Sequence, residues 1–266
     1  MSVANALTSS TTLKALRILE AVADSSQPVS LSDVAAVVGT DKSTAYRMLN
    51  TLVDAGYLVR DEASKRYRMS YKVVSLSRNL LAENEVFQLS RQVLERLATV
   101  THETVHLCVL DGSATVLVQK VKGTQLVAVD FQIGDRSPLH CTSIGKGLLA
   151  YQDARYIEEI IAAGLPPMAR NTITEPDRFR AEMHRVRAQG YAVDDHEFDD
   201  TMRCIAAPIF ERDGRVQMGI SISGPDSRFT FDKLDELRQA MVDATWELSE
   251  RLGGVPWRSN LTTPQR

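Results

Sequence analysis

The sequence has few cysteines and no long hydrophobic run, and both absences narrow the class of protein. Its three cysteines, Cys108, Cys141 and Cys204, are far apart and form no CxxC pair, which argues against a disulfide framework and a structural zinc site. The longest apolar run, 34–38, has five residues, far fewer than the roughly 20 that span a bilayer. Residues 1–12 lack the apolar stretch of a secretion signal. We therefore expect a cytoplasmic protein with free thiols and no membrane contact.

The chain also lacks an excess of basic residues. Its formal net charge of −3 by itself argues against nucleic acid as a partner. However, residues 1–82 carry ten Lys and Arg against seven Asp and Glu, a net +3, whereas the remaining 184 residues carry 21 against 27, a net −6. Within 42–72, seven basic residues stand against three acidic ones. This asymmetry predicts a small basic module attached to a larger acidic one.

Three helical patterns follow one another near the N-terminus, where apolar residues recur at helical spacing behind polar residues suited to capping. The expected helices lie at about 12–25, 30–39 and 41–56, the first of them capped by Thr11 or Thr12. Two strand-like runs at 57–60 and 67–70 then predict a β-hairpin. Two helices joined by a tight glycine turn and followed by a hairpin indicate a winged helix-turn-helix domain, which we place at 10–70.

The third predicted helix presents polar side chains opposite its apolar stripe, and the wing carries basic residues near its tip. These donors and acceptors suit phosphate oxygens and base edges. The candidates for contacts with double-stranded operator DNA are Lys42, Ser43, Thr44, Arg47, Asn50, Lys65 and Arg66. The alternative, basic residues that are merely solvated, explains less well why glycine turn, polar helix and basic wing occur in this order. One such module buries only about 600–1,000 Å², so a homo-oligomer is expected.

The rest of the chain predicts a linker and a mixed domain. Residues 71–84 form a helical pattern whose apolar positions have no partner face in the small module, which suggests packing on another copy. Within 85–253 the expected helices are 86–101, 143–151, 154–163, 176–189 and 231–252, and the expected strands are 105–110, 115–121, 126–131, 204–210 and 216–223. The fold class is therefore α+β, an antiparallel sheet flanked by helices. The polar tail 254–266 is expected to be loosely ordered.

Five motifs resemble, in order and spacing, those of the IclR family of bacterial transcriptional regulators. They are KSTAYRML at 42–49, PLHCTSIGKG at 138–147, GYAVDD at 190–195, CIAAPI at 204–209 and SISGP at 221–225. The resemblance covers about residues 10–255. It implies a homodimer or a dimer of dimers that binds a palindromic operator and senses a small metabolite through a GAF-like effector-binding domain.

The resemblance also implies which residues bind the effector. On the matching motifs these are Asp194, Cys204, Ser221, Ser223, the main chain of Ser143 and Ile144, and the apolar wall residues Leu126 and Val129. N–H groups at a helix start near Ser143 favour a carboxylate. Asp194 suits a hydroxyl or hydrated carbonyl at the other end of the ligand. We therefore expect a repressor that responds to a small oxo or hydroxy carboxylic acid.

Other functions fit the sequence less well. An aromatic-acid-responsive activator and a thiol-based redox sensor using Cys141 or Cys204 stay open as alternatives. An enzyme built from Asp194, His196 and Cys204 is disfavoured, because a strand cysteine lacks the helix N-terminus that lowers a thiol pKa. The acidic run 194–200 is expected to be a solvated loop rather than a metal site, and the Gly-Lys-Gly of the second motif lacks the other residues of a phosphate-binding loop. We expect no catalytic activity, no metal and no cofactor.

Overall fold

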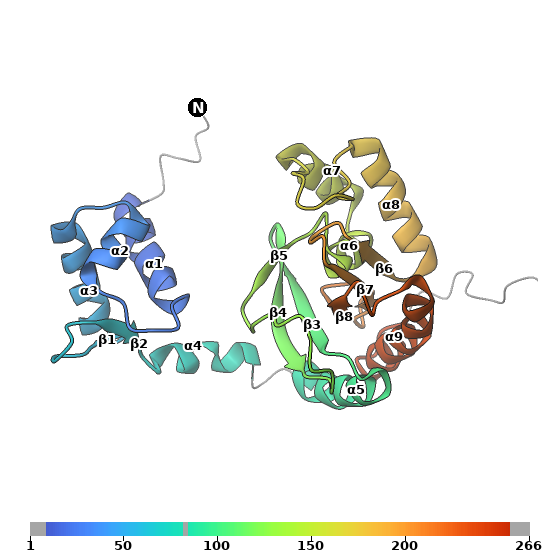
Figure 1. Cartoon of the computed structure of the whole chain (residues 1–266), viewed down its shortest axis with the longest axis horizontal. Coiled ribbons are helices and arrows are strands. Elements are labelled where there is room, and N and C mark those ends of the chain that lie inside the picture. The colour runs from blue at the N-terminus through green and yellow to red at the C-terminus, as the bar shows by residue number, and fades with distance from the viewer. Residues whose placement is uncertain (1–8, 82–84, 256–266) are drawn as a thin grey trace, which may run out of the picture. The chain divides into compact units, whose positions relative to one another are not determined.

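The computed structural model describes residues 9–81 and 85–255. The chain divides into two compact units, and the boundary along the sequence lies between residues 84 and 85. The first unit contains α1 (Ser10–Ala23), α2 (Leu31–Val38), α3 (Lys42–Asp54), β1 (Leu58–Arg60), β2 (Tyr67–Met69) and α4 (Lys72–Leu81) (Figure 1). The two strands pair antiparallel. The unit is the winged helix-turn-helix that the sequence predicted, and the helical part of the linker is described over 72–81.

Local capping chemistry sets the helix boundaries of this unit. Ser30 begins α2 with a capping box, and Gly39 ends it in the left-handed conformation, at a φ of 66°, which glycine adopts without steric cost. The predicted cap of α1 at Thr11 or Thr12 is wrong. Ser9 occupies that place, and its hydroxyl accepts a hydrogen bond from the N–H of Thr12 at 3.3 Å.

The wing is fastened to the helices by backbone pairing and by one buried ring. Tyr67 is buried in the core that the three helices share with the hairpin. Its N–H and C=O pair with Val29, at 2.8 and 2.9 Å. The segment between α1 and α2 thus continues the two-stranded sheet, which fixes the wing beside the helix-turn-helix.

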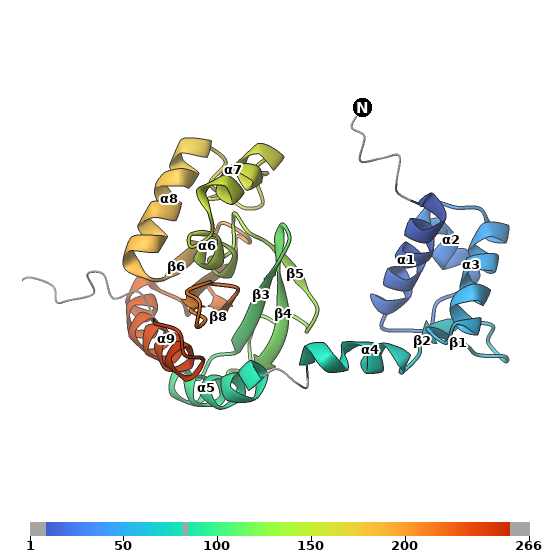
Figure 2. The same ribbon diagram turned by 180° about the vertical axis from the view of Figure 1, so that it is seen from behind.

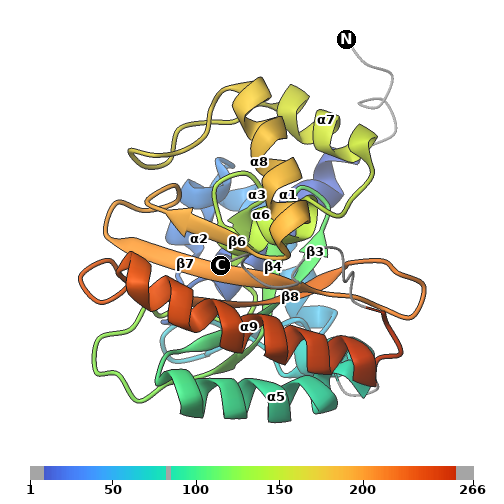
Figure 3. The ribbon, with the colours of Figure 1, turned by 90° about the vertical axis from the view of Figure 1, so that its right-hand side faces the viewer.

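The second unit is a six-stranded sheet with helices on both faces. Its elements are α5 (Glu85–Thr101), β3 (Val105–Asp111), β4 (Ala114–Val121), β5 (Arg136–Pro138), α6 (Ser143–Leu149), α7 (Ala154–Ala163), α8 (Pro176–Gln189), β6 (Ala192–Asp195), β7 (Met202–Ile209), β8 (Met218–Pro225) and α9 (Phe231–Arg251). All neighbours in the order β5-β4-β3-β8-β7-β6 pair antiparallel. Helices α5 and α9 lie side by side on one face, and α6, α7 and α8 lie on the other (Figures 2 and 3). The α+β prediction is confirmed.

Strand alternation divides this sheet into an apolar and a polar face, because successive side chains point to opposite sides. On β7 and β8, Ile205 and Ile222 pack with the residues of α5 and α9 in the main core. The intervening positions carry cysteine, alanine and serine. They face α6, whose Ile144 and Leu148 pack over Ala206. The polar face beneath α6 is where a ligand site can form.

The predicted strand at 126–131 is wrong, because this segment lies in the loop between β4 and β5. Its carbonyls are bound by side chains rather than by a neighbouring strand. Lys120 Nζ donates to the carbonyl of Phe131 at 2.5 Å, and Arg228 donates to that of Val127 at 3.0 Å. The edge partner of β4 is instead the short strand β5, and both β5 and β6 went unpredicted. The predicted tail lies outside the described residues from 256 onward.

Candidate functional site

The exposed face of α3 carries most of the residues predicted to contact DNA. Lys42, Ser43 and Arg47 are exposed, whereas Ala45 and Leu49 on the opposite face are completely buried. Within the described part of the chain, the side chains of Lys42 and Arg47 make no hydrogen bond or ion pair. Their donors are therefore available to an external partner.

Three other residues predicted to contact DNA already have partners. The hydroxyl and N–H of Thr44 both donate to the carboxylate of Asp41, at 2.7 and 2.9 Å, which caps α3. Lys65 pairs with Glu62 at 2.8 Å, and Arg66 donates to the carbonyl of Pro28 at 2.9 Å. These contacts position the first turn of α3 and the wing.

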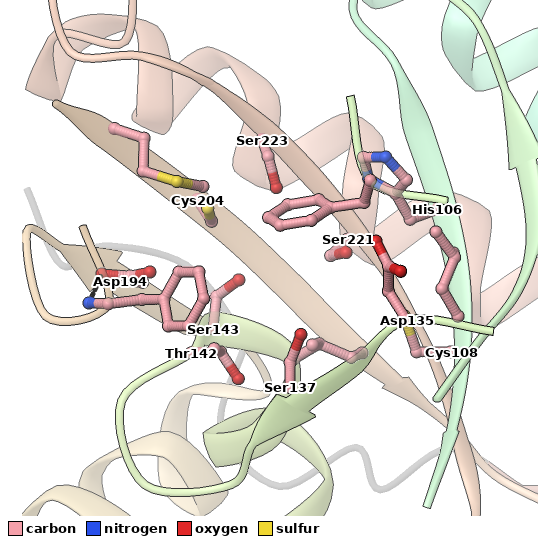
Figure 4. A pocket seen from close by; sticks show the side chains of 15 residues that line it. His106, Cys108, Asp135, Ser137, Thr142, Ser143, Asp194, Cys204, Ser221 and Ser223 are labelled. Atoms are coloured by element: carbon pink, nitrogen blue, oxygen red, sulfur yellow. Dashed lines mark hydrogen bonds between the residues drawn. The ribbon is translucent and has the colours of Figure 1, made fainter. Parts of the chain in front are cut away.

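A pocket lies between the polar face of the sheet, the start of α6 and the loop between β4 and β5 (Figure 4). Its lining residues are His106, Cys108, Leu117, Phe131, Asp135, Ser137, Thr142, Ser143, Ile144, Asp194, Phe198, Met202, Cys204, Ser221 and Ser223. A pocket lined by apolar side chains and a few convergent polar groups suits a small organic ligand. Six of the eight residues predicted to bind the effector are among them.

Sheet register brings distant polar residues into this pocket. Asp194 is opposite Cys204 on the neighbouring strand, and Cys204 is opposite Ser223 on the next. Directly opposed residues on antiparallel strands have Cβ atoms about 5 Å apart and share a face. Thr142 caps α6 by accepting the N–H of Gly145 at 3.0 Å. The N–H groups of the first helical residues, from Ser143 on, have no acceptor within the helix.

Leu126 and Val129 do not line the pocket, so the apolar wall inferred for them is misplaced. Leu126 is fully exposed, because the segment that carries it is a loop and not an inward-facing strand. The same loop contributes Phe131 and Asp135 instead. The sequence signal for this wall was weak, since no motif marks the segment.

The carboxyl group of Asp194 is completely buried and only half satisfied. Its Oδ1 accepts hydrogen bonds from the N–H groups of Glu197 and Phe198, at 2.8 and 3.3 Å, whereas Oδ2 has no hydrogen-bond partner among residues 9–81 and 85–255. Burial raises the pKa of Asp194 to about 6, against the opposing effect of these hydrogen bonds and of Lys146. Leaving a buried acceptor unpaired costs free energy. A ligand hydroxyl that donates to Oδ2 removes this cost.

A buried ion cluster lies behind Asp194. Lys146 of α6 has no exposed surface and pairs with Glu182 of α8, at 2.9 Å, and with Glu197. Burial raises the pKa of Glu197 to about 7, and its Oε2 has no hydrogen-bond partner among the described residues. The sequence predicted that the acidic run 194–200 is a solvated loop. This prediction is wrong for the first part of the run, which is buried where Glu197 pairs with Lys146.

The cysteines and the histidine of the alternative enzyme hypothesis do not form one site. Burial raises the pKa of Cys108 and of Cys141 to about 12, and burial raises the pKa of Cys204 well above its usual value. Protonated, buried thiols are poor nucleophiles and poor redox sensors. Both ring nitrogens of His196 face carboxylates, Asp195 at 2.9 Å and Asp226 at 3.3 Å. The triad of Asp194, His196 and Cys204 is not assembled.

Comparison with known proteins identifies the class to which this fold and pocket belong. Residues 11–62 match the IclR helix-turn-helix domain, and residues 78–250 match the bacterial transcriptional regulator IclR C-terminal domain. The chain belongs to the IclR family of bacterial transcriptional regulators, with a DNA-binding helix-turn-helix and a C-terminal effector domain. Its relatives are regulators and not enzymes.

Individual relatives span nearly the whole chain. The HTH-type transcriptional regulator KdgR of Escherichia coli K12 is 31% identical over 245 residues, which cover 92% of this chain and 93% of that protein. The transcriptional repressor IclR of the same organism is 27% identical over 245 residues, which cover 91% of this chain and 89% of that protein. The crystal structure of the Thermotoga maritima IclR matches with a TM-score of 0.74 at 31% identity, over 91% of this chain and 98% of that one. No helix within residues 9–81 and 85–255 is long and apolar enough to cross a membrane.

Proposed function

We propose that the protein is a cytoplasmic repressor that binds a palindromic operator and releases it when a small oxo or hydroxy carboxylic acid occupies the pocket. The observation that carries the proposal is the unpaired, fully buried Oδ2 of Asp194 in the pocket of a regulator. A group of this kind is costly in the free protein and is stabilised by a ligand that donates a hydrogen bond.

In this proposal α3 lies in the major groove. Lys42, Ser43, Arg47 and Asn50 supply base and phosphate contacts, while Thr44 fixes the helix start. Lys65 and Arg66 of the wing approach the flanking phosphates. Such contacts make binding salt-dependent.

Two or four copies act together, because a single module buries too little surface for tight specific binding. The exposed apolar side chains of α4 support this part of the proposal. Val74 and Leu76 are 65% and 56% exposed within one copy, and a second copy is a suitable cover for them. Effector binding then favours one of two dimer arrangements through the linker 71–84, by no more than its differential affinity for them. Solution scattering that shows one unchanged arrangement with and without effector, despite altered DNA affinity, would contradict this route.

The effector lies with its carboxylate at the start of α6, near the N–H groups of Ser143 and Ile144, because the described residues that line the pocket include no lysine or arginine. A hydroxyl or hydrated carbonyl then donates to Asp194. Ser221, Ser223 and the Cys204 thiol complete the polar side of the pocket.

An aromatic acid that activates transcription is the second candidate. It is favoured by two phenylalanine rings in the pocket lining, Phe131 and Phe198, whose centroids are 6.4 Å apart. Flat rings pack well in such surroundings. Benzoate and 4-hydroxybenzoate therefore belong in the same screen as the aliphatic acids.

Gel retardation with DNA from beside its own gene, followed by a thermal-shift screen of these acids, tests the proposal. We expect a retarded band, a rise of the melting temperature with an oxo or hydroxy acid, and loss of that rise in Asp194→Ala. No retarded band together with turnover of a screened compound would overturn it. Unfolding of apo Asp194→Ala would show that this residue is structural.

A further inference from the structure

His106 is a second unsatisfied group in the pocket. It lies on β3 and is 2% exposed, and neither of its ring nitrogens has a hydrogen-bond partner in the part of the chain that the structure describes. Its ring packs edge-on against Phe131, with centroids 5.7 Å apart. A buried imidazole without hydrogen-bond partners costs free energy, so the polar edge of this ring does not contribute favourably to the stability of the free protein.

The imidazole is neutral at physiological pH. Burial lowers the pKa of His106 to about 4, and the positive charge of Lys120 adds to this effect. A neutral imidazole has one N–H donor and one bare acceptor. It therefore matches a group that both accepts and donates, such as a hydroxyl, and it offers no positive charge to a carboxylate.

Ser221 adds a second hydroxyl beside this ring. It is directly opposite His106 on the neighbouring strand β8, so both side chains face the pocket. Within the described residues, the Ser221 hydroxyl makes no hydrogen bond. Figure 4 shows His106 and Asp135 on one side of the pocket and Asp194 on the other. The carboxyl group of Asp135 further disfavours an anion on the His106 side.

We propose that His106 and Ser221 form a second recognition point, which binds a neutral hydroxyl or carbonyl of the effector away from Asp194. The effector is then an acid with an additional oxygen function near its distal end, rather than a two-carbon oxo acid or an alkyl acid. This inference rests on the proposed function of the pocket, and His106 acts as a specificity-determining residue for it.

Calorimetry on the full chain with paired ligands tests the inference. The probes are straight-chain 2-oxo acids of about four to six carbons, each with and without a terminal hydroxyl. We expect at least one hydroxylated acid to bind about tenfold more tightly than its parent, in line with one well-made hydrogen bond to a buried group. His106→Phe should reduce this ratio to about one, because the ring edge then has no polar atom.

Three further variants keep the test informative. Ser221→Ala should lower the same ratio in part, and His106→Asn, which keeps a donor and an acceptor, should retain part of it. His184→Phe is the matched control, because His184 is exposed on α8 and does not line this pocket, and it should leave the ratio unchanged.

The outcomes separate this inference from the proposed function. A wild type that binds the acids but shows no preference for any hydroxylated one overturns the inference alone. So does a preference that survives in both His106→Phe and His106→Asn. A wild type that binds none of the acids overturns the proposed effector class and this inference with it.

Discussion

The face of α3 and the pocket under α6 use polar side chains in opposite ways. On α3, Lys42 and Arg47 are exposed and unpaired, where water satisfies them at little cost. In the pocket, Asp194 Oδ2 and both ring nitrogens of His106 are buried and have no hydrogen-bond partner within the described residues. The first surface suits the binding of a large polyanion from solution. The second contains buried polar atoms whose missing hydrogen bonds cost free energy, and a small ligand that pairs with them removes this cost.

The comparison predicts that the two regions respond differently to loss of one charge. Lys146→Ala should give the largest effect on stability, about 3–5 kcal/mol of unfolding free energy, because it leaves Glu197 buried without a cation and leaves Glu182 with Arg185 alone. Hydrogen exchange should show the loss in α6 and β7 and spare α2 and α3. Arg180→Ala, which removes an exposed pair with Glu158, is the control and should change little. Equal loosening of α3 would contradict this separation.

Asp194→Asn sharpens the comparison through pH. Burial raises the pKa of Asp194 to about 6, so the folded state favours the protonated acid. The wild type is therefore most stable below the ordinary aspartate pKa, and it loses stability as the pH rises through about 6. The neutral variant lacks this loss. At about pH 8 it should be more stable than the wild type by about 3 kcal/mol, and at about pH 4 the two should converge.

Denaturant titrations at both pH values, without effector, measure this difference. The same variant should show no thermal shift with effector at either pH. A stability difference that does not change with pH would mean that Asp194 is already satisfied in the free protein.

Arg47→Ala tests the exposed surface. We expect operator affinity to fall by more than about 1 kcal/mol, and the slope of affinity against salt to decrease by about one if Arg47 contacts a phosphate. Fluorescence anisotropy with operator DNA at several salt concentrations measures both. Arg155→Ala is the matched control, since this exposed arginine is on α7. If both variants bind like the wild type, Arg47 does not contact DNA.

Thr44→Ala should have the smallest effect on DNA binding. Its hydroxyl already donates to Asp41, so we expect operator affinity within about twofold of the wild type and a slightly lower melting temperature from the weakened cap. Anisotropy and thermal unfolding of the same sample distinguish the two effects. A loss of affinity as large as that of Arg47→Ala would mean that the hydroxyl leaves Asp41 to contact DNA.

The N-terminal unit could be predicted closely because its determinants are local. Capping residues, the glycine at 39 and helical spacing all act within a few positions, and only the cap of α1 was misassigned. The second unit depends on long-range contacts. The loop at 126–131 has strand-like residues, but Lys120 and Arg228 bind its carbonyls. The first part of the acidic run is buried because Glu197 pairs with Lys146, about 50 positions earlier in the chain.

The pocket could be predicted only where motifs marked it. The matched motifs placed Asp194, Cys204 and the two serines, whereas His106 and Asp135 were missed. A signal for His106 existed, because it is a polar residue among the apolar residues of β3. Which face of the strand is polar depends on pairing with β8, and pairing is not a local property.

The central claim is that effector binding in the pocket controls DNA binding by α3. The most direct measurement is the affinity of the full chain for operator DNA, titrated with the tightest acid from the screen, in the wild type and in Asp194→Asn. We predict that saturating acid weakens the wild-type complex by about tenfold, within the usual range of allosteric coupling, and leaves the variant unaffected. Unchanged DNA affinity of the wild type, while calorimetry shows the acid bound, would contradict the account.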